Sequence, residues 1–329
     1  MKAAWFNKFG PATEVLELGE LPDPVPAAGE VLVRLHTSGI NPSDVKKRAG
    51  AFPNLLDGGL VVPNSDGAGV IVAVGEGISA DRVGERVWVY QAQYGRRLGT
   101  AAELVALDAR RAVVLPTEAS FEVGACLGIP VMTAHRCVFA DGPVSGQTIL
   151  VTGGAGRVGH YAIQWASQSG ARVIATASKP DDVEACLAAG ASAVVNHRQP
   201  GWSKEVLRES GGKPVDRVID VEFGANLPEV LDCVRIGGVI ATYSSTQVRE
   251  PALPFLRMMF MDLTVRMVIV YAMPEEAKQK AAEDINEWLR AGRLTHRIAH
   301  VLPLERIAEG NQLIEQGGFG GCVVLTMGG

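Results

Sequence analysis

The pattern of apolar and polar positions divides the chain into a first part with short strands and a second part in which strands alternate with helices. Up to Ser120, short apolar or alternating runs such as Val31–Thr37 and Gly67–Val74 are separated by clusters of Pro and Gly. Runs of this length with a period of two are typical of β-strands between turns. The pattern therefore predicts an irregular β-barrel or sandwich without a long helix.

A helical spacing over Ser120–Phe139 marks the change, and from Gly146 onward strands and helices alternate. The predicted strands are nearly continuous apolar runs, beginning with Thr148–Gly153 and ending with Leu263–Ala272. Strands of this kind are buried on both faces, which is typical of a parallel sheet covered by helices. Right-handed crossovers then give a doubly wound Rossmann sheet.

The last part of the chain leaves this alternation. Pro274–Arg290 has the spacing of an amphipathic helix, and a strand-to-helix pattern and a final strand, Cys322–Met327, follow it. We expect this segment to rejoin the N-terminal region. The sequence thus predicts an α/β protein of two domains, a β-rich catalytic domain of residues 1–122 and 273–329 and a Rossmann domain of residues 123–272.

Composition narrows the class of protein. The chain of 329 residues has a formal net charge of −5 and no block of five like charges, which argues against a nucleic-acid surface or a polybasic membrane patch. Its five cysteines are scattered and include no CxxC pair, as in a reduced intracellular protein. The N-terminus lacks the apolar region of a signal peptide, and the most apolar segment is shorter than the ~20 residues of a membrane span. We therefore expect a soluble cytoplasmic protein.

A glycine-rich turn lies between the strand Thr148–Gly153 and the helix that follows it, with the spacing GxGxxG. In this context the first glycine permits the tight turn, the second lets the backbone approach a pyrophosphate, and the third lets helix and strand pack closely. The N-terminus of the helix offers N–H groups and a partial positive charge to the phosphates. A glycine-rich turn without a ligand is the alternative. The predicted pyrophosphate site consists of Gly154, Ala155, Gly156, Arg157, Val158 and Gly159.

The end of the second Rossmann strand indicates which dinucleotide binds. NAD sites usually have an acidic residue there, but this strand ends in Ser178 and Lys179. A hydroxyl and an ammonium suit a 2′-phosphate, so the sequence favours NADPH. His197 and Arg198, after the third strand, either extend this pocket or are solvated surface residues. One of the two aspartates that closely follow Lys179 would instead serve NAD.

Several motifs in order along the chain resemble those of the medium-chain dehydrogenase/reductase superfamily, above all its zinc-free quinone oxidoreductase branch, the ζ-crystallin-like proteins. The motifs are GINPSDVKKRAG, VPNSDGAGVIVAVGEGI, VGERVW, VTGGAGRVGHYAIQ and the terminal GGCVVL. The resemblance implies a GroES-like catalytic domain, a Rossmann domain and catalysis in the cleft between them. It also implies a homodimer paired through the last Rossmann strand, Leu263–Ala272.

The resemblance also bears on zinc. The first zinc ligand of the related alcohol dehydrogenases, a Cys, falls on Asn41, and the His-Glu pair of the second motif falls on Ser65 and Asp66. The third ligand position falls near Pro130. None of these replacements is a good zinc ligand, and the lobe of four closely spaced cysteines that holds a structural zinc is missing. The sequence therefore predicts no metal.

Four residues are predicted to act on the substrate. The amide of Asn41 can donate to the substrate or to a ribose. Lys46 stands where the ζ-crystallin-like pattern commonly has Tyr, and it either polarises a carbonyl and supplies a proton or is a solvated charge. Thr133 matches a Thr near the nicotinamide in the family, with a bond to its own helix as the alternative. Tyr271 either donates to a substrate oxygen or lines the dimer edge.

Three further residues complete the candidate set. Tyr243 and Ser244 follow the fifth Rossmann strand, at the strand ends where open α/β sheets bind ligands, and we assign them to the cofactor. Asp44 either caps the turn after Asn41 or orients a neighbouring cation, and capping is the favoured reading.

Without a metal, alcohol oxidation lacks the Lewis acid that lowers the pKa of the alcohol. Reduction of a conjugated carbonyl needs only hydrogen-bond donors and a positive charge near the developing oxyanion. The sequence therefore predicts an NADPH-dependent, metal-independent reductase of quinones or α,β-unsaturated carbonyls. The alternatives are a 2-alkenal or enoyl reductase with little quinone activity, a zinc alcohol dehydrogenase, and a dinucleotide-binding protein without enzymatic activity.

Overall fold

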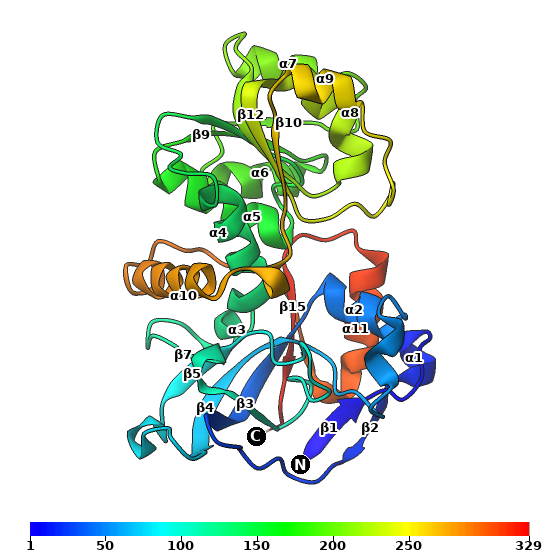
Figure 1. Ribbon diagram of the computed structural model, residues 1–329, viewed down its shortest axis with the longest axis vertical. Helices are drawn as coiled ribbons and strands as arrows, with labels where there is room; N and C mark the ends of the chain where they lie inside the picture. Colours follow the sequence, from blue (N-terminus) through cyan, green and yellow to red (C-terminus); the bar gives the residue numbers. More distant parts are fainter. Residues whose placement is uncertain (329) are drawn as a thin grey trace. The chain divides into compact units, whose positions relative to one another are not determined.

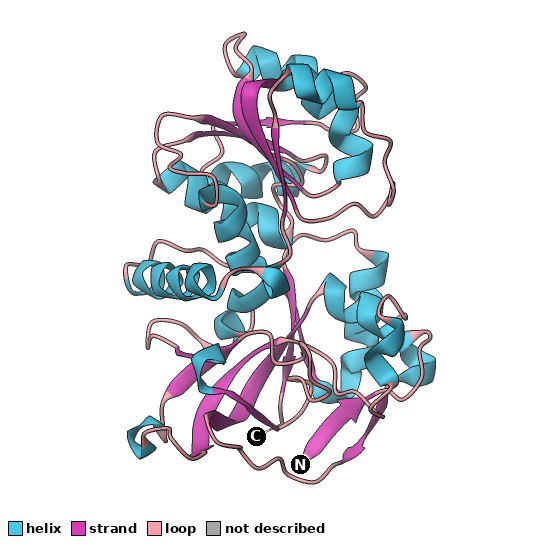
Figure 2. Cartoon of the chain, viewed as in Figure 1, coloured by secondary structure: helices cyan, strands magenta, loops and turns pink. Residues whose placement is uncertain are grey.

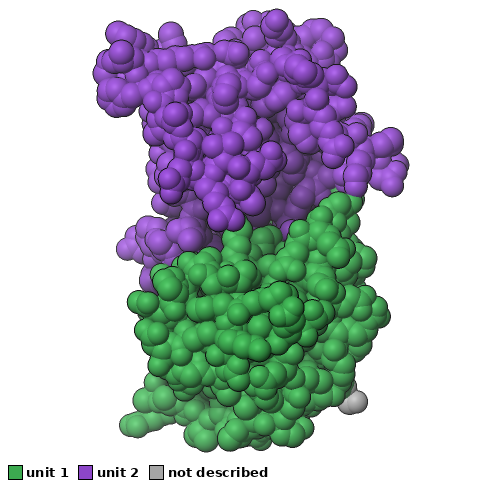
Figure 3. Space-filling view, turned by 90° about the vertical axis from the view of Figure 1, so that its right-hand side faces the viewer, with its two compact units in different colours: residues 1–129, 282–329 green, residues 130–281 purple. Residues whose placement is uncertain are grey.

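The structure is a computed structural model that describes residues 1–328 (Figure 1). The chain forms two compact units, coloured separately in Figure 3. Unit 1 consists of Met1–Ile129 and the chain from Ala282 onward, and unit 2 is Pro130–Ala281. Both divisions of the chain lie a few residues after the domain boundaries that the sequence analysis placed after residues 122 and 272.

The first of these divisions lies in an irregular helical segment. The helix expected over Ser120–Phe139 is broken into α3 (Phe121–Gly124), a π-helical turn (Leu127–Val131) and α4 (Met132–Phe139). Pro130 lies inside the π-helical turn, and proline has no N–H to complete an α-helical hydrogen bond. An α-helical hydrogen bond is therefore missing at this point, where the chain forms the π-helical turn.

Unit 1 is built on a mostly antiparallel sheet (Figure 2). The long strand β3 (Glu30–Ile40) is central, with β4 on one side and β15 and β6 as its other partners. Only β14 and β15 pair in parallel. The remaining strands of this sheet are β4 (Asp66–Val74), β5 (Arg86–Val89), β6 (Leu104–Asp108), β7 (Ala112–Val114), β14 (Ile298–Pro303) and β15 (Cys322–Thr326).

The C-terminal segment returns to unit 1, as the sequence predicted, because β15 pairs antiparallel with the end of β3. A separate two-stranded sheet joins β1 (Lys2–Trp5) and β2 (Glu17–Glu20). The core of the unit is aliphatic and is contributed by strands far apart in the sequence. The helices of the N- and C-terminal segments are α1 (Ala12–Val15), α2 (Pro42–Arg48), α10 (Glu275–Arg290) and α11 (Ile307–Gln316).

Unit 2 is a six-stranded parallel sheet in the order β10-β9-β8-β11-β12-β13. In Figure 1, helices α5 and α6 lie on one side of this sheet and α7 and α8 on the other. The predicted doubly wound Rossmann sheet is thus confirmed, and with it the α/β class. The elements are β8 (Thr148–Val151), α5 (Arg157–Gln168), β9 (Arg172–Thr176), α6 (Pro180–Ala188), β10 (Ala193–Val195), α7 (Trp202–Glu209), β11 (Val215–Asp220), α8 (Phe223–Cys233), β12 (Val234–Thr242), α9 (Phe255–Phe260) and β13 (Thr264–Met267).

The last Rossmann strand is shorter than the sequence predicted. Its neighbour β12 ends at Thr242, which pairs with Met267, so the ladder has no partner for the residues beyond. The chain then forms a 3-10 turn, Val270–Ala272, and Tyr271 lies in this turn instead of in a strand. Within residues 1–328, no helix combines the length and the apolar character that crossing a membrane requires.

Candidate active site

The turn between β3 and α2 places the first group of polar side chains. Asn41 is the N-cap of α2, and Pro42 occupies the first helical position, which proline favours. The backbone N–H of Asn41 donates to the carboxylate of Asp44 at 2.9 Å. This is the reciprocal bond of a capping box, so the capping interpretation of Asp44 is confirmed.

One face of α2 is buried, and this decides which lysine points inward. Asp44, Lys47 and Arg48 are spaced three and four residues apart and are buried, whereas Lys46 is exposed. The Arg48 guanidinium contacts Asn311 and Glu315 of α11, which fixes the rotation of α2 about its axis. A role for Lys46 at the substrate stays a prediction, and the buried cation of this segment is Lys47.

Five side chains of unit 1 form a buried polar group, which we name the Asn41 cluster: Asn41, Asp44, Lys47, Ser65 and Asp66. None of the five is more than 6% exposed. Ser65 and Asp66 come from the start of β4. The side-chain amide of Asn41 donates to Asp66 Oδ2 at 2.9 Å, and Lys47 Nζ lies 3.5 Å from Ser65 Oγ.

Asp66 is a fully buried member of the cluster. Its Oδ2 also accepts the backbone N–H of Ile129 at 2.7 Å, whereas Oδ1 has no hydrogen-bond partner among the described residues. Burial raises the pKa of Asp66 to about 8, so the carboxyl group holds its proton at neutral pH. A Cβ on Gly128 would lie 2.1 Å from Oδ1, so only glycine fits beside this carboxyl group.

The two charges of α2 within the cluster influence each other. Lys47 Nζ donates to the carbonyl oxygen of Gln93 at 2.8 Å. Burial lowers the pKa of Lys47, and the nearby carboxyl groups of Asp44 and Asp66 oppose this shift. Burial raises the pKa of Asp44 to about 6, and the charge of Lys47 is the largest opposing influence. Asp44 is therefore mostly ionised at neutral pH.

The backbone around Ser65 adopts uncommon conformations. Asn64 and Gln91 have φ values of 71° and 55°, in the left-handed region that non-glycine residues rarely occupy. The side chain of Asn64 donates to Ser38 Oγ at 3.0 Å, and the N–H of Ala92 donates to the carbonyl oxygen of Ser65 at 3.0 Å. Strained residues of this kind are concentrated at functional sites, where surrounding bonds hold them.

The donor set of the Asn41 cluster does not fit zinc. Zinc requires deprotonated thiolate, imidazole or carboxylate ligands. By the resemblance, the first ligand position of zinc alcohol dehydrogenases holds the amide of Asn41, the His-Glu pair falls on Ser65 and Asp66, and the third ligand position falls near Pro130, with the ammonium of Lys47 beside Ser65. Nowhere in residues 1–328 do three or more His, Cys, Asp or Glu side chains gather closely enough to hold a metal ion.

The glycine-rich turn of unit 2 connects β8 to α5. Gly153, with φ of 61°, makes the left-handed turn that the sequence analysis assigned to Gly154. A Cβ on Gly154 would lie 2.8 Å from Cys186 Sγ and 2.9 Å from the side chains of Ala175 and Ile163, so glycine is needed there for packing. A Cβ on Gly159 would lie 2.3 Å from the carbonyl oxygen of Gly153, which agrees with its predicted role in close packing.

The start of α5 has the properties of a phosphate site. Gly156 is the N-cap and has no side chain to bond the first N–H groups of the helix. A Cβ there would meet only the carbonyl oxygen of Gly153, at 3.1 Å. Ala155 is buried, and Arg157 and Val158 are partly buried at the first turn. An uncapped helix N-terminus approached by a bare backbone fits the pyrophosphate of a dinucleotide.

Hydrogen bonds to neighbouring strands hold this turn. Thr152 Oγ1 donates to Asp220 Oδ1 at 2.6 Å, and Asn226 donates to the same oxygen at 2.8 Å. The N–H of Gly153 donates to Thr176 Oγ1 at 3.0 Å. The sequence analysis missed these residues, although Thr152, Thr176 and Asp220 all lie where adjacent parallel strands end.

The predicted 2′-phosphate residues follow β9 and β10. Ser178 is partly buried and Lys179 is exposed, and Lys179 is the N-cap of α6. His197 and Arg198 are exposed in the turn after β10. Desolvation and then the charge of Arg198 lower the pKa of His197, so His197 is neutral near pH 7.

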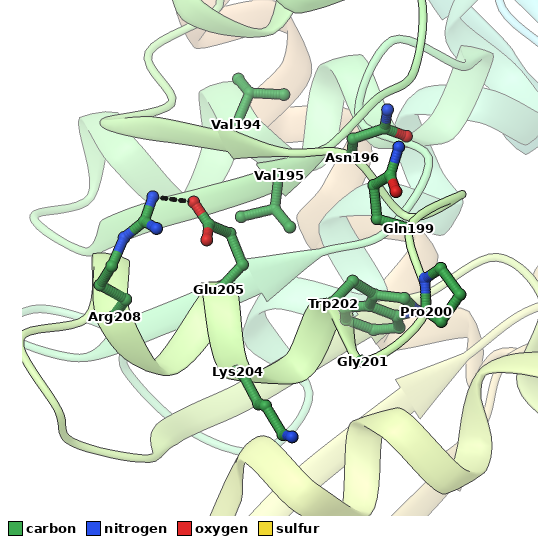
Figure 4. A pocket seen from close by; sticks show the side chains of 10 residues that line it. All are labelled: Val194, Val195, Asn196, Gln199, Pro200, Gly201, Trp202, Lys204, Glu205 and Arg208. Carbon is green, nitrogen blue, oxygen red and sulfur yellow. Dashed lines mark hydrogen bonds and ion pairs between the residues drawn. The ribbon is translucent and has the colours of Figure 1, made fainter.

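Unit 2 contains pockets near two groups of predicted cofactor residues. One, of about 630 Å³, lies between the end of β10, the turn after it and α7, where the ion pair of Glu205 and Arg208 borders it (Figure 4). Asn196 and Gln199 line this pocket, but His197 and Arg198, in the same turn, do not.

The other pocket, of about 420 Å³, lies at the C-terminal ends of β12 and β13 and is lined by Tyr243 and Ser244, both predicted cofactor residues. Burial raises the pKa of the Tyr243 phenol well above its usual value, so it remains a neutral donor. Glu222 shapes the loop beside this pocket by accepting the backbone N–H groups of Thr246 and Gln247 at 2.8 and 2.9 Å. Thr133 and Tyr271 are buried in unit 2 but do not line this pocket.

The chain matches two family models. Residues 27–117 match the alcohol dehydrogenase GroES-like domain, and residues 158–287 match the family described as zinc-binding dehydrogenase. Human quinone oxidoreductase is 30% identical over 99% of this chain and 98% of its own length.

Solved structures of related oxidoreductases share the fold of this chain over nearly its full length. An NAD-dependent alcohol dehydrogenase is 32% identical, with a TM-score of 0.89 and full coverage of both chains. A mycobacterial protein solved with NADPH is 26% identical, with a TM-score of 0.88, and the match covers 99% of this chain and 100% of the other. The chain therefore belongs to the quinone oxidoreductase branch of the medium-chain dehydrogenase/reductase superfamily, oxidoreductases that bind a nicotinamide dinucleotide.

Proposed function

We propose that this protein is an NADPH-dependent, metal-independent reductase of quinones or α,β-unsaturated carbonyls. The observation that carries the proposal is the Asn41 cluster, in which a buried amide, hydroxyl and carboxyl group stand where, by the resemblance, zinc alcohol dehydrogenases have a Cys and a His-Glu pair. Such a site offers hydrogen bonds to a reducible oxygen but no Lewis acid for alcohol oxidation. The names of the relatives, quinone oxidoreductase, and the NADPH in a related structure support the same assignment.

In the proposal unit 2 binds the phosphate groups of the cofactor at two places. The turn Gly154–Gly159 binds the pyrophosphate, and Ser178 and Lys179 bind the 2′-phosphate, with further contributions from Arg198 and His197. A bound reduced nicotinamide supplies the hydride for the reaction. Lys179 and Arg198 carry permanent positive charges, so they provide the main charge contrast between NADPH and NADH.

The remaining predicted residues serve the acceptor or the nicotinamide. Asn41, held in one orientation by its bond to Asp66, presents its amide to the acceptor or to a ribose. Tyr243 and Ser244 contact the nicotinamide end of the cofactor from the pocket that they line. Thr133, Tyr271 and Lys46 are proposed to contact the nicotinamide or the acceptor.

We further propose a homodimer through the outer edge of the Rossmann sheet. In the described part of the chain, β13 has a strand partner on one side only. No residue of α9 is buried, and four of its large apolar side chains are exposed: Phe255, Leu256, Met259 and Phe260. Met267 at the end of β13 and Ile269 just after it are exposed as well. A second copy of the chain, adding its own edge, would cover this apolar surface.

Steady-state kinetics of the purified protein test the proposed reaction. We expect oxidation of NADPH with 1,4-benzoquinone or with a simple enone, and no loss of rate after dialysis against EDTA. A kcat/KM markedly higher with the enone would replace the quinone assignment by a 2-alkenal or enoyl reductase. Tight NADPH binding without oxidation by either acceptor would indicate a binding protein, and stoichiometric zinc in the purified protein would contradict the metal-independent reaction.

A further inference from the structure

Lys47 is a buried charge that the proposed reaction does not yet use. Only 6% of its surface is exposed, although it lies next to the exposed Lys46. Burying an ammonium group is costly unless hydrogen bonds and opposite charges compensate. Its neighbours supply both, through the carbonyl oxygen of Gln93 at 2.8 Å, Ser65 Oγ at 3.5 Å, and the charge of Asp44. The contacts that compensate this cost all lie in or beside the Asn41 cluster, so the charge of Lys47 acts on that cluster.

The contacts of Lys47 lead to the amide of Asn41. Ser65, which Lys47 contacts, also helps to lower the pKa of the Asp44 carboxyl group against the larger effect of burial. The same carboxylate accepts the backbone N–H of Asn41, and the Asn41 amide donates to Asp66. The charge of Lys47 thus acts on Asp44, Asp44 holds the backbone of Asn41, and Asp66 holds the side-chain amide of the same residue.

The charges of the cluster balance only with Lys47 present. Asp66 holds its proton at neutral pH, so Asp44 is the anion and Lys47 the cation of the group. In zinc-dependent members of the superfamily a metal cation lies among the corresponding positions. In this chain an ammonium built into α2 is the cation there.

We infer that Lys47 is a positioning residue for the proposed reaction: its buried ammonium is the internal cation of the Asn41 cluster and, through Ser65 and Asp44, fixes the Asn41 amide in its working orientation. The inference rests on the proposed function for its catalytic consequence. The arrangement of the cluster itself is open to measurement without any substrate.

Lys47→Met tests this inference, because methionine keeps most of the length of the side chain and removes the charge. Lys8→Met, at an exposed lysine of the same unit, is the control. We expect kcat with 1,4-benzoquinone or an enone to fall tenfold or more, while KM and the dissociation constant of NADPH change less than about threefold, because a small misorientation at the reacting groups costs mainly rate. The control should match the wild type in all three.

The pH dependence separates positioning from a merely structural role. Removing the charge of Lys47 raises the pKa of Asp44, so the loss of kcat at low pH should begin at a higher pH in Lys47→Met than in the wild type. The groups that face Asp44 are Asn41, Lys47, Ser65 and Asp66, and only one of them is changed. A variant with a lower melting temperature but with wild-type kcat and pH profile would overturn the inference.

Two further measurements keep the test decisive. If Lys47→Met does not fold, Ser65→Ala removes the hydroxyl between Lys47 and Asp44 and should lower kcat in the same way, and an unchanged kcat would overturn the inference. A 13C titration of the aspartate carboxyl groups reports Asp44 directly. An inactive wild type whose Asp44 titration still moves upward in Lys47→Met would overturn the proposed reaction and retain the cluster, whereas an unmoved titration would overturn the inference.

Discussion

At the scale of single residues, Lys179 is where the proposed preference for NADPH over NADH can be tested. It is exposed at the N-cap of α6, one residue after the partly buried Ser178. We expect Lys179→Ala to weaken NADPH binding about 10- to 100-fold, the equivalent of losing one charge-assisted hydrogen bond, and NADH binding less than about threefold. Dissociation constants from nucleotide fluorescence measure both, with the exposed Lys213→Ala as control. Equal weakening of the two nucleotides would show that Lys179 does not contact the 2′-phosphate.

Asp66 makes a prediction about pH and stability. Its pKa is raised to about 8 in the folded chain, so the unfolded chain releases this proton at a lower pH than the folded chain does. The stabilising contribution of the protonated group is complete below the ordinary aspartate pKa and is lost as the pH rises towards 8. Urea unfolding should therefore show that, between pH 5 and pH 8, the free energy of unfolding of Asp66→Asn rises relative to that of the wild type. The expected rise is up to about 1.4 kcal/mol per pH unit.

Asp44 titrates in both the wild type and Asp66→Asn, so its contribution to the pH dependence of the unfolding free energy largely cancels in the difference between the two proteins. The matched control is Asp57→Asn, at an exposed aspartate of the same unit. It should run parallel to the wild type across the same pH range. A constant difference between Asp66→Asn and the wild type would mean that Asp66 is ionised in the folded protein.

The adjacent lysines show what the sequence could and could not reveal about single residues. The motif resemblance drew attention to Lys46 because a tyrosine is common at that position. The side-chain environment depends on the rotation of α2, which Arg48 sets by its contacts with Asn311 and Glu315 of a distant helix. Even with residues 42–48 recognised as a helix, the charged face of Asp44, Lys47 and Arg48 would have been assigned to solvent, because its burial depends on partners far away in the sequence.

At the scale of elements, two glycines of the glycine-rich turn are expected to serve different purposes, Gly159 the stability of the fold and Gly156 the binding of NADPH. Gly159→Ala brings a Cβ to within 2.3 Å of a backbone oxygen, which must move, and we expect a loss of about 1–3 kcal/mol in the free energy of unfolding. Gly156→Ala meets only one atom, at 3.1 Å, and its φ of −71° suits alanine. We expect this variant to unfold within about 1 kcal/mol of the wild type.

Gly156→Ala, the more stable of the two variants, is expected to show the clear loss of NADPH affinity. The new methyl group in Gly156→Ala lies on the backbone that the pyrophosphate approaches, so its NADPH dissociation constant should rise tenfold or more. Each protein serves as the control for the other, through thermal unfolding and nucleotide fluorescence measured on the same samples. Unchanged NADPH affinity in Gly156→Ala would place the pyrophosphate elsewhere.

The elements also show why some predictions succeeded. The Rossmann strands were found because burial on both faces leaves continuous apolar runs, which need no partner to be recognised. The end of β13 was missed because it depends on where β12 ends, at Thr242. Tyr271 accordingly lies in a 3-10 turn that no local pattern marked.

At the scale of the whole molecule, the order of the motifs carried more information than any one of them. The sequence predicted two domains, a doubly wound sheet and the return of the C-terminal segment, and β15 pairs with β3 as that return requires. The Asn41 cluster could be predicted only in part. The replacement of zinc ligands was visible in the sequence, but the joining of Asn41 to Asp66 and of Lys47 to Ser65 depends on the approach of α2 to β4.

The proposed homodimer concerns the whole molecule, and two substitutions at the outer edge of the Rossmann sheet can test the proposed interface. Phe260 and Met267 are 77% and 71% exposed, on α9 and β13. We expect the wild type to have the mass of a dimer in light scattering after size exclusion, and Phe260→Glu with Met267→Glu to give the 34.8 kDa monomer, because buried unpaired carboxylates oppose association. Leu187→Glu, at an exposed leucine of α6, should remain dimeric. A monomeric wild type at micromolar concentration, or a double variant that stays dimeric, would show that the outer edge of β13 is not the interface.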